Sequence, residues 1–102
     1  MAEPLIVSVD HEIGREEAVR RLKPIVGYAV KTFPMLKVEE ETWIDDRLSF
    51  RTRVYGQVTS GSIDVTDRQV RVEMTLPFLL RQFASFAEDT IKTRFAELLR
   101  KR

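Results

Sequence analysis

Apolar and polar residues alternate from Leu36 to Leu76, and this period of two constrains the fold more than any other feature of the chain. Turn residues divide the stretch into four strands. In the last hairpin, a two-residue turn at Asp67-Arg68 would set Val65 opposite Val70, with apolar pairs continuing along one face. The preceding hairpin can turn at Gly56-Gln57, with glycine first as a type II′ turn prefers. The alternation therefore predicts an antiparallel meander with one apolar and one charged face.

The first hairpin of the meander is less regular. Closing it through residues 45–47 would place Glu39 and Glu41 opposite arginines on the charged face, where they would form solvated ion pairs. In the same register Glu40 falls on the apolar face, at its rim, and Trp43 falls on the charged face. Glu40 is the one exception to the predicted register.

Helical periodicity flanks the strands on both sides. Residues 15–33 carry an apolar stripe at about 100° per residue and predict one helix, kinked at Pro24 because proline removes a backbone hydrogen bond. Residues 77–100 predict a second helix, with Pro77 in its first turn. Near the start of the chain, Leu5, Val7 and Val9 alternate with polar positions and indicate a short strand.

We therefore expect an α+β fold in the order β-α-β-β-β-β-α, with two layers and both helices packed on the apolar face of the antiparallel sheet. The 102 residues are too few for two ordinary cores, so residues 1–102 are interpreted as a single domain. The position of the first strand in the sheet is left open. Four aromatic residues are expected to fill the core: Phe33, Phe50, Phe83 and Phe95.

Composition excludes several chemistries. The chain has no cysteine, so thiolate metal sites, thiol nucleophiles and disulfides are absent. With 17 Lys+Arg against 16 Asp+Glu, the formal charge of +1 argues against an overall electrostatic attraction to nucleic acid. Arg51, Arg53 and Tyr55 could stack single-stranded nucleic acid, but the interleaved carboxylates would repel phosphates. No apolar run approaches the roughly 18 residues of a spanning helix, and a cytoplasmic location is expected.

The chain has one histidine, His11, which lies between two carboxylates. It could act as a general base or supply one metal ligand, but no second histidine or ligand spacing accompanies it. A loop histidine is the simpler interpretation. We accordingly expect a protein without catalytic residues, metal or cofactor.

Apolar side chains remain after the core stripes are assigned. Phe78, Leu79 and Phe86 lie off the core stripe of the last helix, and Trp43 and Tyr55 are placed outside the core as well. Together they predict a contact surface for a protein or a lipid-like partner.

The order of several short motifs resembles a known family. Each motif alone consists of turn and strand chemistry, but their succession across nearly the whole chain is specific. The motifs are His11–Ala18, Val38–Trp43, Asp46–Phe50, Tyr55–Val65 and Val70–Pro77. This succession resembles the bacterial polyhydroxyalkanoic acid system proteins, and Pro24 is a departure from the family's first helix.

The resemblance implies a role in polyhydroxyalkanoate storage, since such proteins are typically encoded beside genes for polymer synthesis or granule proteins. It implies no reaction and no catalytic residues. The leading hypothesis is a non-enzymatic accessory or binding protein that contacts the granule or granule-associated proteins. The alternative is a helix-grip-like module that encloses a hydroxyacyl or fatty-acyl chain, which would need a cavity. A homodimer would hide the excess apolar surface.

Overall fold

The computed structural model describes residues 4–100, and of Phe78 and Leu79 only the backbone. It confirms the predicted α+β architecture and the order of strands and helices along the chain. The elements in chain order are β1 (Leu5–Asp10), α1 (Arg15–Leu22), α2 (Ile25–Thr32), β2 (Leu36–Ile44), β3 (Arg47–Val54), β4 (Gln57–Val65), β5 (Gln69–Thr75), the 3₁₀ helix η1 (Phe78–Phe83) and α3 (Ala84–Leu98).

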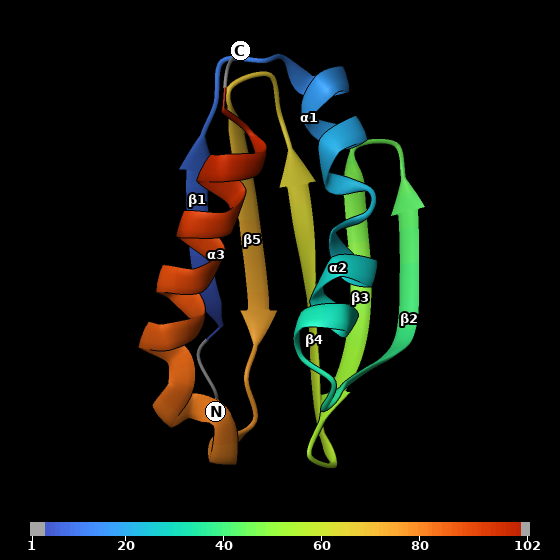
Figure 1. Cartoon of the computed structure of the whole chain (residues 1–102), viewed down its shortest axis with the longest axis vertical. Coiled ribbons are helices and arrows are strands. Elements are labelled where there is room, and N and C mark those ends of the chain that lie inside the picture. The colour runs from blue at the N-terminus through green and yellow to red at the C-terminus, as the bar shows by residue number, and fades with distance from the viewer. Residues whose placement is uncertain (1–3, 101–102) are drawn as a thin grey trace.

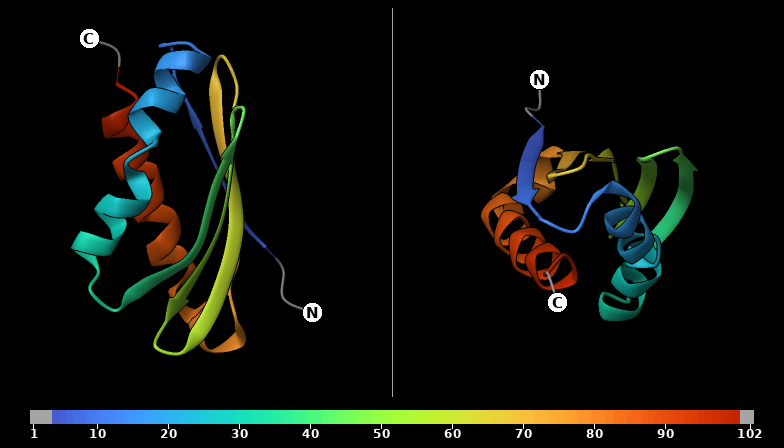
Figure 2. Two further views of the ribbon diagram at one scale, coloured as in Figure 1. Left: turned by 90° about the vertical axis from the view of Figure 1, so that its right-hand side faces the viewer. Right: turned by 90° about the horizontal axis from the view of Figure 1, so that it is seen from above.

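The five strands form one antiparallel sheet in the order β1-β5-β4-β3-β2 (Figure 1). The first strand, left unplaced by the sequence, pairs with β5, so Val7 lies opposite Val72 and Val9 opposite Val70. All helices cover the same face of the sheet (Figure 2). Helix α3 packs over β1, and α2 lies toward β2 at the other edge.

The register of the β4–β5 hairpin is confirmed, with Val65 opposite Val70. The predicted β3–β4 turn is wrong by one position. It lies at Tyr55-Gly56, where both residues have positive φ as a type I′ turn requires. Moving the turn by one residue shifts the strand register by two, so every side chain keeps its predicted face but meets a different partner.

The first hairpin needs a larger correction. Its turn is Asp45-Asp46, and a β-bulge interrupts β2 between Val38 and Glu40. Because this turn is one residue shorter than predicted, residues 40–44 lie on the opposite faces, and the bulge keeps Leu36 and Val38 on the core face. Glu40 therefore lies on the charged face opposite Arg51, and Trp43 lies on the core face opposite Leu48, contrary to both predictions.

The bulge also changes the predicted ion pairs of the outer face. Glu41 pairs with Phe50 in the register rather than with an arginine. Glu39 does lie beside Arg53, with 2.9 Å between its carboxylate and the Arg53 Nη2 atom. Arg51 lies between Glu39 and Glu40, at 3.7 and 3.6 Å. The outer face of β2 and β3 is therefore covered by neighbouring charges of opposite sign.

Pro24 breaks the predicted first helix instead of only bending it. Residues 23–24 form a turn, and α2 restarts with Pro24 at its N-cap. Helix α1 buries Ala18, Val19 and Leu22 in the core, whereas α2 buries no residue fully. The second predicted helix also divides, into η1 and α3.

The core lies between α1, the C-terminal end of α3 and the sheet. Its largest fully buried side chains are Leu22, Leu48, Val7 and Val70. Of the four aromatic residues expected to fill the core, Phe95 is buried, Phe33 and Phe50 are half-buried, and Phe83 is 53% exposed. The prediction that these four aromatic side chains fill the core is therefore largely wrong.

Candidate functional site

A wide apolar groove runs between the two helical segments. Its volume is about 520 Å³, its walls are α2 on one side and η1 with α3 on the other, and its floor is formed by β3, β4 and β5. Among the described residues that line it, Arg94 is the only one with a charged side chain. The floor comprises Leu48, Phe50, Thr52, Val54, Thr59, Ile63, Val72 and Met74.

The groove exists because the helices leave the middle of the sheet uncovered. Helix α3 lies over β1 and α2 toward β2, so the apolar face of the central strands is open between them. Pro24 contributes to this arrangement, because α2 does not continue the path of α1 into the core. Apolar residues that periodicity assigns to a core thus line an open surface.

The groove has an exposed apolar rim, which we define as Tyr28, Met35, Tyr55, Phe83 and Phe86. All five line the groove and are also more than a third exposed. They come from α2, the connection after it, the β3–β4 turn, the end of η1 and the start of α3, which lie in the lower half of Figure 1. Such a cluster is larger than the single exposed apolar residues that are normal on surfaces.

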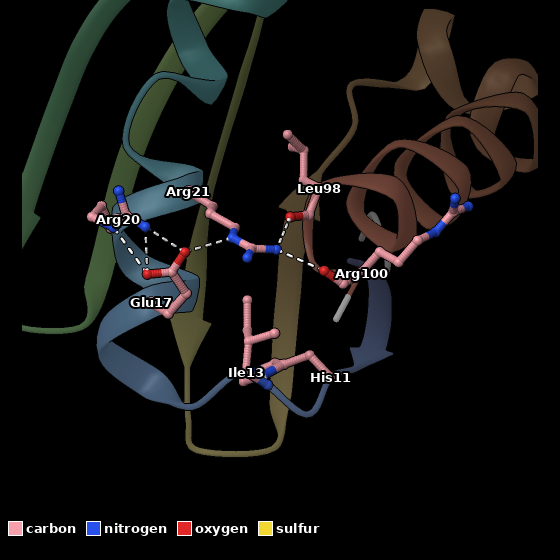
Figure 3. Close-up of polar contacts among 7 residues, drawn as sticks. All are labelled: His11, Ile13, Glu17, Arg20, Arg21, Leu98 and Arg100. Atoms are coloured by element: carbon pink, nitrogen blue, oxygen red, sulfur yellow. Dashed lines mark hydrogen bonds and ion pairs between the residues drawn. The ribbon is translucent and has the colours of Figure 1, made fainter. Parts of the chain in front are cut away.

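Outside the groove lining, a polar contact joins α1 to the end of α3. The Arg21 guanidinium donates to the backbone carbonyls of Leu98 and Arg100, at 3.1 and 2.8 Å, and to the Glu17 carboxylate at 2.8 Å (Figure 3). Carbonyls at a helix C-terminus lack intrahelical partners, so a cation there satisfies them. Arg21 thereby joins the two helices at this end.

Glu17 accepts hydrogen bonds from both neighbouring arginines. The bonds from Arg20 and then Arg21 hold the pKa of the Glu17 carboxyl below its ordinary value. In the same contact, Glu17 raises the pKa of the Arg20 guanidinium. Glu17 therefore stays ionised and orients Arg21 toward α3.

Two polar features belong to the groove itself. In its floor, the hydroxyls of Thr52 and Thr59 are 2.6 Å apart and both residues are buried. At its mouth, the Arg94 guanidinium of α3 lies over the Tyr28 ring of α2, 5.9 Å from the ring centroid. The first pair keeps the floor free of unpaired hydroxyls, and the second spans the two walls.

His11 lies outside the groove lining and serves the loop that follows β1. Its Nε2 is 2.9 Å from the Thr66 carbonyl, and its Nδ1 is 3.4 Å from the Ile13 backbone nitrogen. The residue is buried and ties the β1–α1 loop to the β4–β5 turn. Within residues 4–100, no three side chains of the metal-binding types come together.

The predicted contact residues fall into three groups. Phe86 and Tyr55 both belong to the rim, where they are 64% and 75% exposed. Trp43 is half-buried against the core, does not line the groove, and has a buried Nε1 without a hydrogen-bond partner. The side chains of Phe78 and Leu79 lie outside the described part of the structure.

Sequence reasoning missed the other groove residues. Phe83 was assigned to the core stripe, and Tyr28, Met35 and Arg94 were not selected. Periodicity identifies the apolar side of a helix, but it does not show whether a neighbour covers that side. The apolar character of residues 25–30, in a helix interrupted by proline, is the one signal that pointed to a separate surface.

None of the helices within residues 4–100 combines the length and apolar character needed to cross a bilayer. The sequence matches no curated protein. A family model described as "Putative polyhydroxyalkanoic acid system protein" matches residues 5–99, which include the whole groove and the Arg21 contact with Leu98. With nearly the entire chain covered, the protein belongs to this family of polyhydroxyalkanoic acid system proteins.

Proposed function

We propose that this protein is a non-enzymatic accessory protein of polyhydroxyalkanoate storage, which contacts the granule through the rim of its groove. The family supplies the link to the polymer. The observation that carries the proposal is the rim, where five apolar side chains from separate elements are exposed together. An aliphatic polyester presents alkyl groups, and covering such a surface removes the rim from water.

The non-enzymatic part of the proposal is supported by the chemistry of the groove. Its described lining is apolar except for threonine and tyrosine hydroxyls and the Arg94 guanidinium. Acid-base catalysis generally uses histidine or carboxylates within reach of a bound substrate. His11 instead contacts backbone atoms of the β1–α1 loop and the β4–β5 turn.

Co-sedimentation of the purified chain with protein-free polyhydroxyalkanoate particles tests this function. Phe86→Glu introduces a charge into the rim, and Ile44→Glu is the matched control, because Ile44 is 67% exposed and pairs with Arg47 at the far end of β2. We expect the wild type and Ile44→Glu to sediment with the particles and Phe86→Glu to remain in solution. Polystyrene particles control for general hydrophobic adsorption.

The size of the effect follows from the exposed area. A phenylalanine side chain can bury about 200 Å², and 64% of Phe86 is exposed. At about 25 cal/mol per Å², complete coverage is worth ~3 kcal/mol, or a ~200-fold change in affinity. Equal sedimentation of both glutamate variants would contradict contact through the rim, provided that both retain the circular dichroism spectrum of the wild type.

The same rim predicts the location and the self-association of the protein. We propose a cytoplasmic protein that collects at storage granules, which a fluorescent fusion would reveal as foci lost in Phe86→Glu. In the absence of a granule, two copies can cover each other's rims as a homodimer. Sedimentation velocity should then show concentration-dependent dimers of the wild type and monomers of Phe86→Glu. If particles do not bind, pull-down of granule proteins with the same variants tests the protein partner.

A second candidate function is favoured by the groove itself: binding of a single hydroxyacyl or fatty-acyl chain. The expected aromatic filling of the core counted against this function, but Phe83 is exposed and Phe50 lies in the groove floor. The volume of about 520 Å³ lies within the range of small-molecule pockets, roughly 300–1,000 Å³. The structure therefore has the cavity that this function needs.

A further inference from the structure

The position of Arg94 suggests which kind of acyl chain the groove takes. We propose that the groove binds a single acyl chain with an anionic head group, with the chain along the apolar walls and the carboxylate at the Arg94 guanidinium. This inference rests on the second candidate function, the binding of one chain. It adds to that function the chemistry of the head group.

Arg94 is the only charged side chain among the described residues of the lining. The ion pair that Arg94 forms within the described part of the chain is weak, since its Nη1 lies 3.9 Å from the Glu97 carboxylate and both side chains are about half exposed. The guanidinium carries five N–H donors in a planar fork that matches a carboxylate. Arg94 therefore retains donors for a ligand at the mouth of an otherwise apolar groove.

The contact with Tyr28 favours this role. The guanidinium lies over the tyrosine ring of the opposite wall, and a cation above an aromatic face keeps its in-plane N–H groups for other partners. The ring restricts the arginine side chain, which lowers the entropy that a ligand must remove on binding. The head-group position is thus partly organised before the ligand arrives.

The chain position follows from the helix that carries Arg94. Ile91 and Ala87 are three and seven residues earlier, on the same side of α3, and both line the groove. Phe86, in the rim, is eight residues from Arg94, or about 12 Å along the helix axis. An extended acyl chain of medium length, held at Arg94 by its carboxylate, would cover this apolar side and reach the rim.

Two sources could provide this ligand chemistry, a plain fatty acid and a 3-hydroxy acid. Thr90 lines the groove one turn before Arg94, so its hydroxyl is placed to hydrogen-bond to a ligand hydroxyl close to the carboxylate. Comparison of decanoate with 3-hydroxydecanoate distinguishes the two sources. Tighter binding of the hydroxy acid, lost in Thr90→Val, would identify the 3-hydroxy acid.

Isothermal titration of the full chain with decanoate and with methyl decanoate tests the proposal. The two ligands share a chain but differ in head-group charge, so we expect the acid to bind about tenfold or more tightly at low salt. Arg94→Gln should remove this preference and leave the affinity for the ester unchanged, while Arg94→Lys should restore part of it. Lys92→Gln is the control, because Lys92 pairs with Glu88 on α3 and does not line the groove.

Each outcome decides a separate point. Equal affinities of the acid and the ester would overturn the assignment of Arg94 while the acyl-chain function stands. A preference for the acid that survives in Arg94→Gln would also overturn it. Absence of binding by both ligands would refute the acyl-chain function together with this inference, and the granule proposal would still be decided by co-sedimentation.

Discussion

The hydroxyl pair in the groove floor provides a quantitative test of the structure. Thr52 and Thr59 are 7% and 5% exposed, and their hydroxyl oxygens are 2.6 Å apart. Thr52→Val removes one hydroxyl at nearly constant volume and leaves the other buried without that partner. We expect each single valine variant to lose about 1–3 kcal/mol of unfolding free energy, the penalty for an unsatisfied buried polar group.

The double variant should behave differently from the sum of the single ones. Replacing both threonines removes donor and acceptor together, and valine suits a strand, so its stability should be close to that of the wild type. The double-mutant cycle should therefore give a coupling energy close to the sum of the two single losses, about 2–6 kcal/mol. This sign of coupling arises only if the two hydroxyls satisfy each other.

Urea unfolding of the four proteins measures the cycle. The single tryptophan, Trp43, packs against the core and reports the transition by fluorescence, and equal m-values confirm that the unfolded states are comparable. Effects of the two single variants that add within about 0.5 kcal/mol would refute the reasoning. That result would mean that water in the groove solvates the hydroxyl that remains.

Three further predictions concern the frame around the groove. Gly61→Ala should destabilise the protein by about 2 kcal/mol in urea unfolding, because a Cβ there would press on the β5 backbone and on the ring of Phe50, 3.0 Å from its Cζ. Arg21→Met should lose about 1–2 kcal/mol, since the carbonyl of Leu98 loses a charged donor; unchanged stability would show that water replaces the guanidinium. The lowered pKa of Glu17 makes its contribution to folding full above its unfolded pKa and lost as the pH falls through the lower folded value. Glu17→Gln should therefore flatten the stability profile between about pH 5 and pH 3, and a profile that keeps its slope would contradict this origin.

Turn chemistry and alternation together explain how much of the sheet could be predicted. The β4–β5 register was predictable because a polar turn and the paired valines Val65 and Val70 agree. The β3–β4 turn was misplaced because Tyr55 adopts positive φ, which the residue type disfavours. The resulting shift of two residues in the strand register left each side chain on its predicted face but gave it a different partner. The Thr52–Thr59 pair was therefore not predicted.

The first hairpin shows how two errors can share one cause. The predicted register placed Glu40 on the apolar face, as its one exception, and Trp43 on the charged face. A turn one residue shorter than predicted moves each of them to the opposite face, and the bulge keeps Leu36 and Val38 on the core face. Three consecutive glutamates carry no apolar alternation, so local periodicity could not locate the bulge.

The groove could not be predicted because periodicity gives the direction of an apolar stripe and not the distance to the next layer. Phe83 and Phe95 share the predicted stripe, yet one is exposed and the other buried. Phe95 belongs to the same buried cluster as Ala18, Val19 and Leu22 of α1, whereas Phe83 lines the groove and is exposed. Only the packing of the two helical segments separates core from groove.

The unequal halves of the first helical segment link this packing to function. Helix α1 is charged on its outer side and buries Ala18, Val19 and Leu22. Helix α2 is mostly apolar and buries none of its residues fully. A break at Pro24 that served stability alone would be expected to leave a polar second helix, since exposed apolar surface gives no hydrophobic stabilisation. The apolar α2 is explained if its surface is covered by something outside the chain, as it would be by the proposed aliphatic partner, with an anionic head group where a single chain occupies the groove.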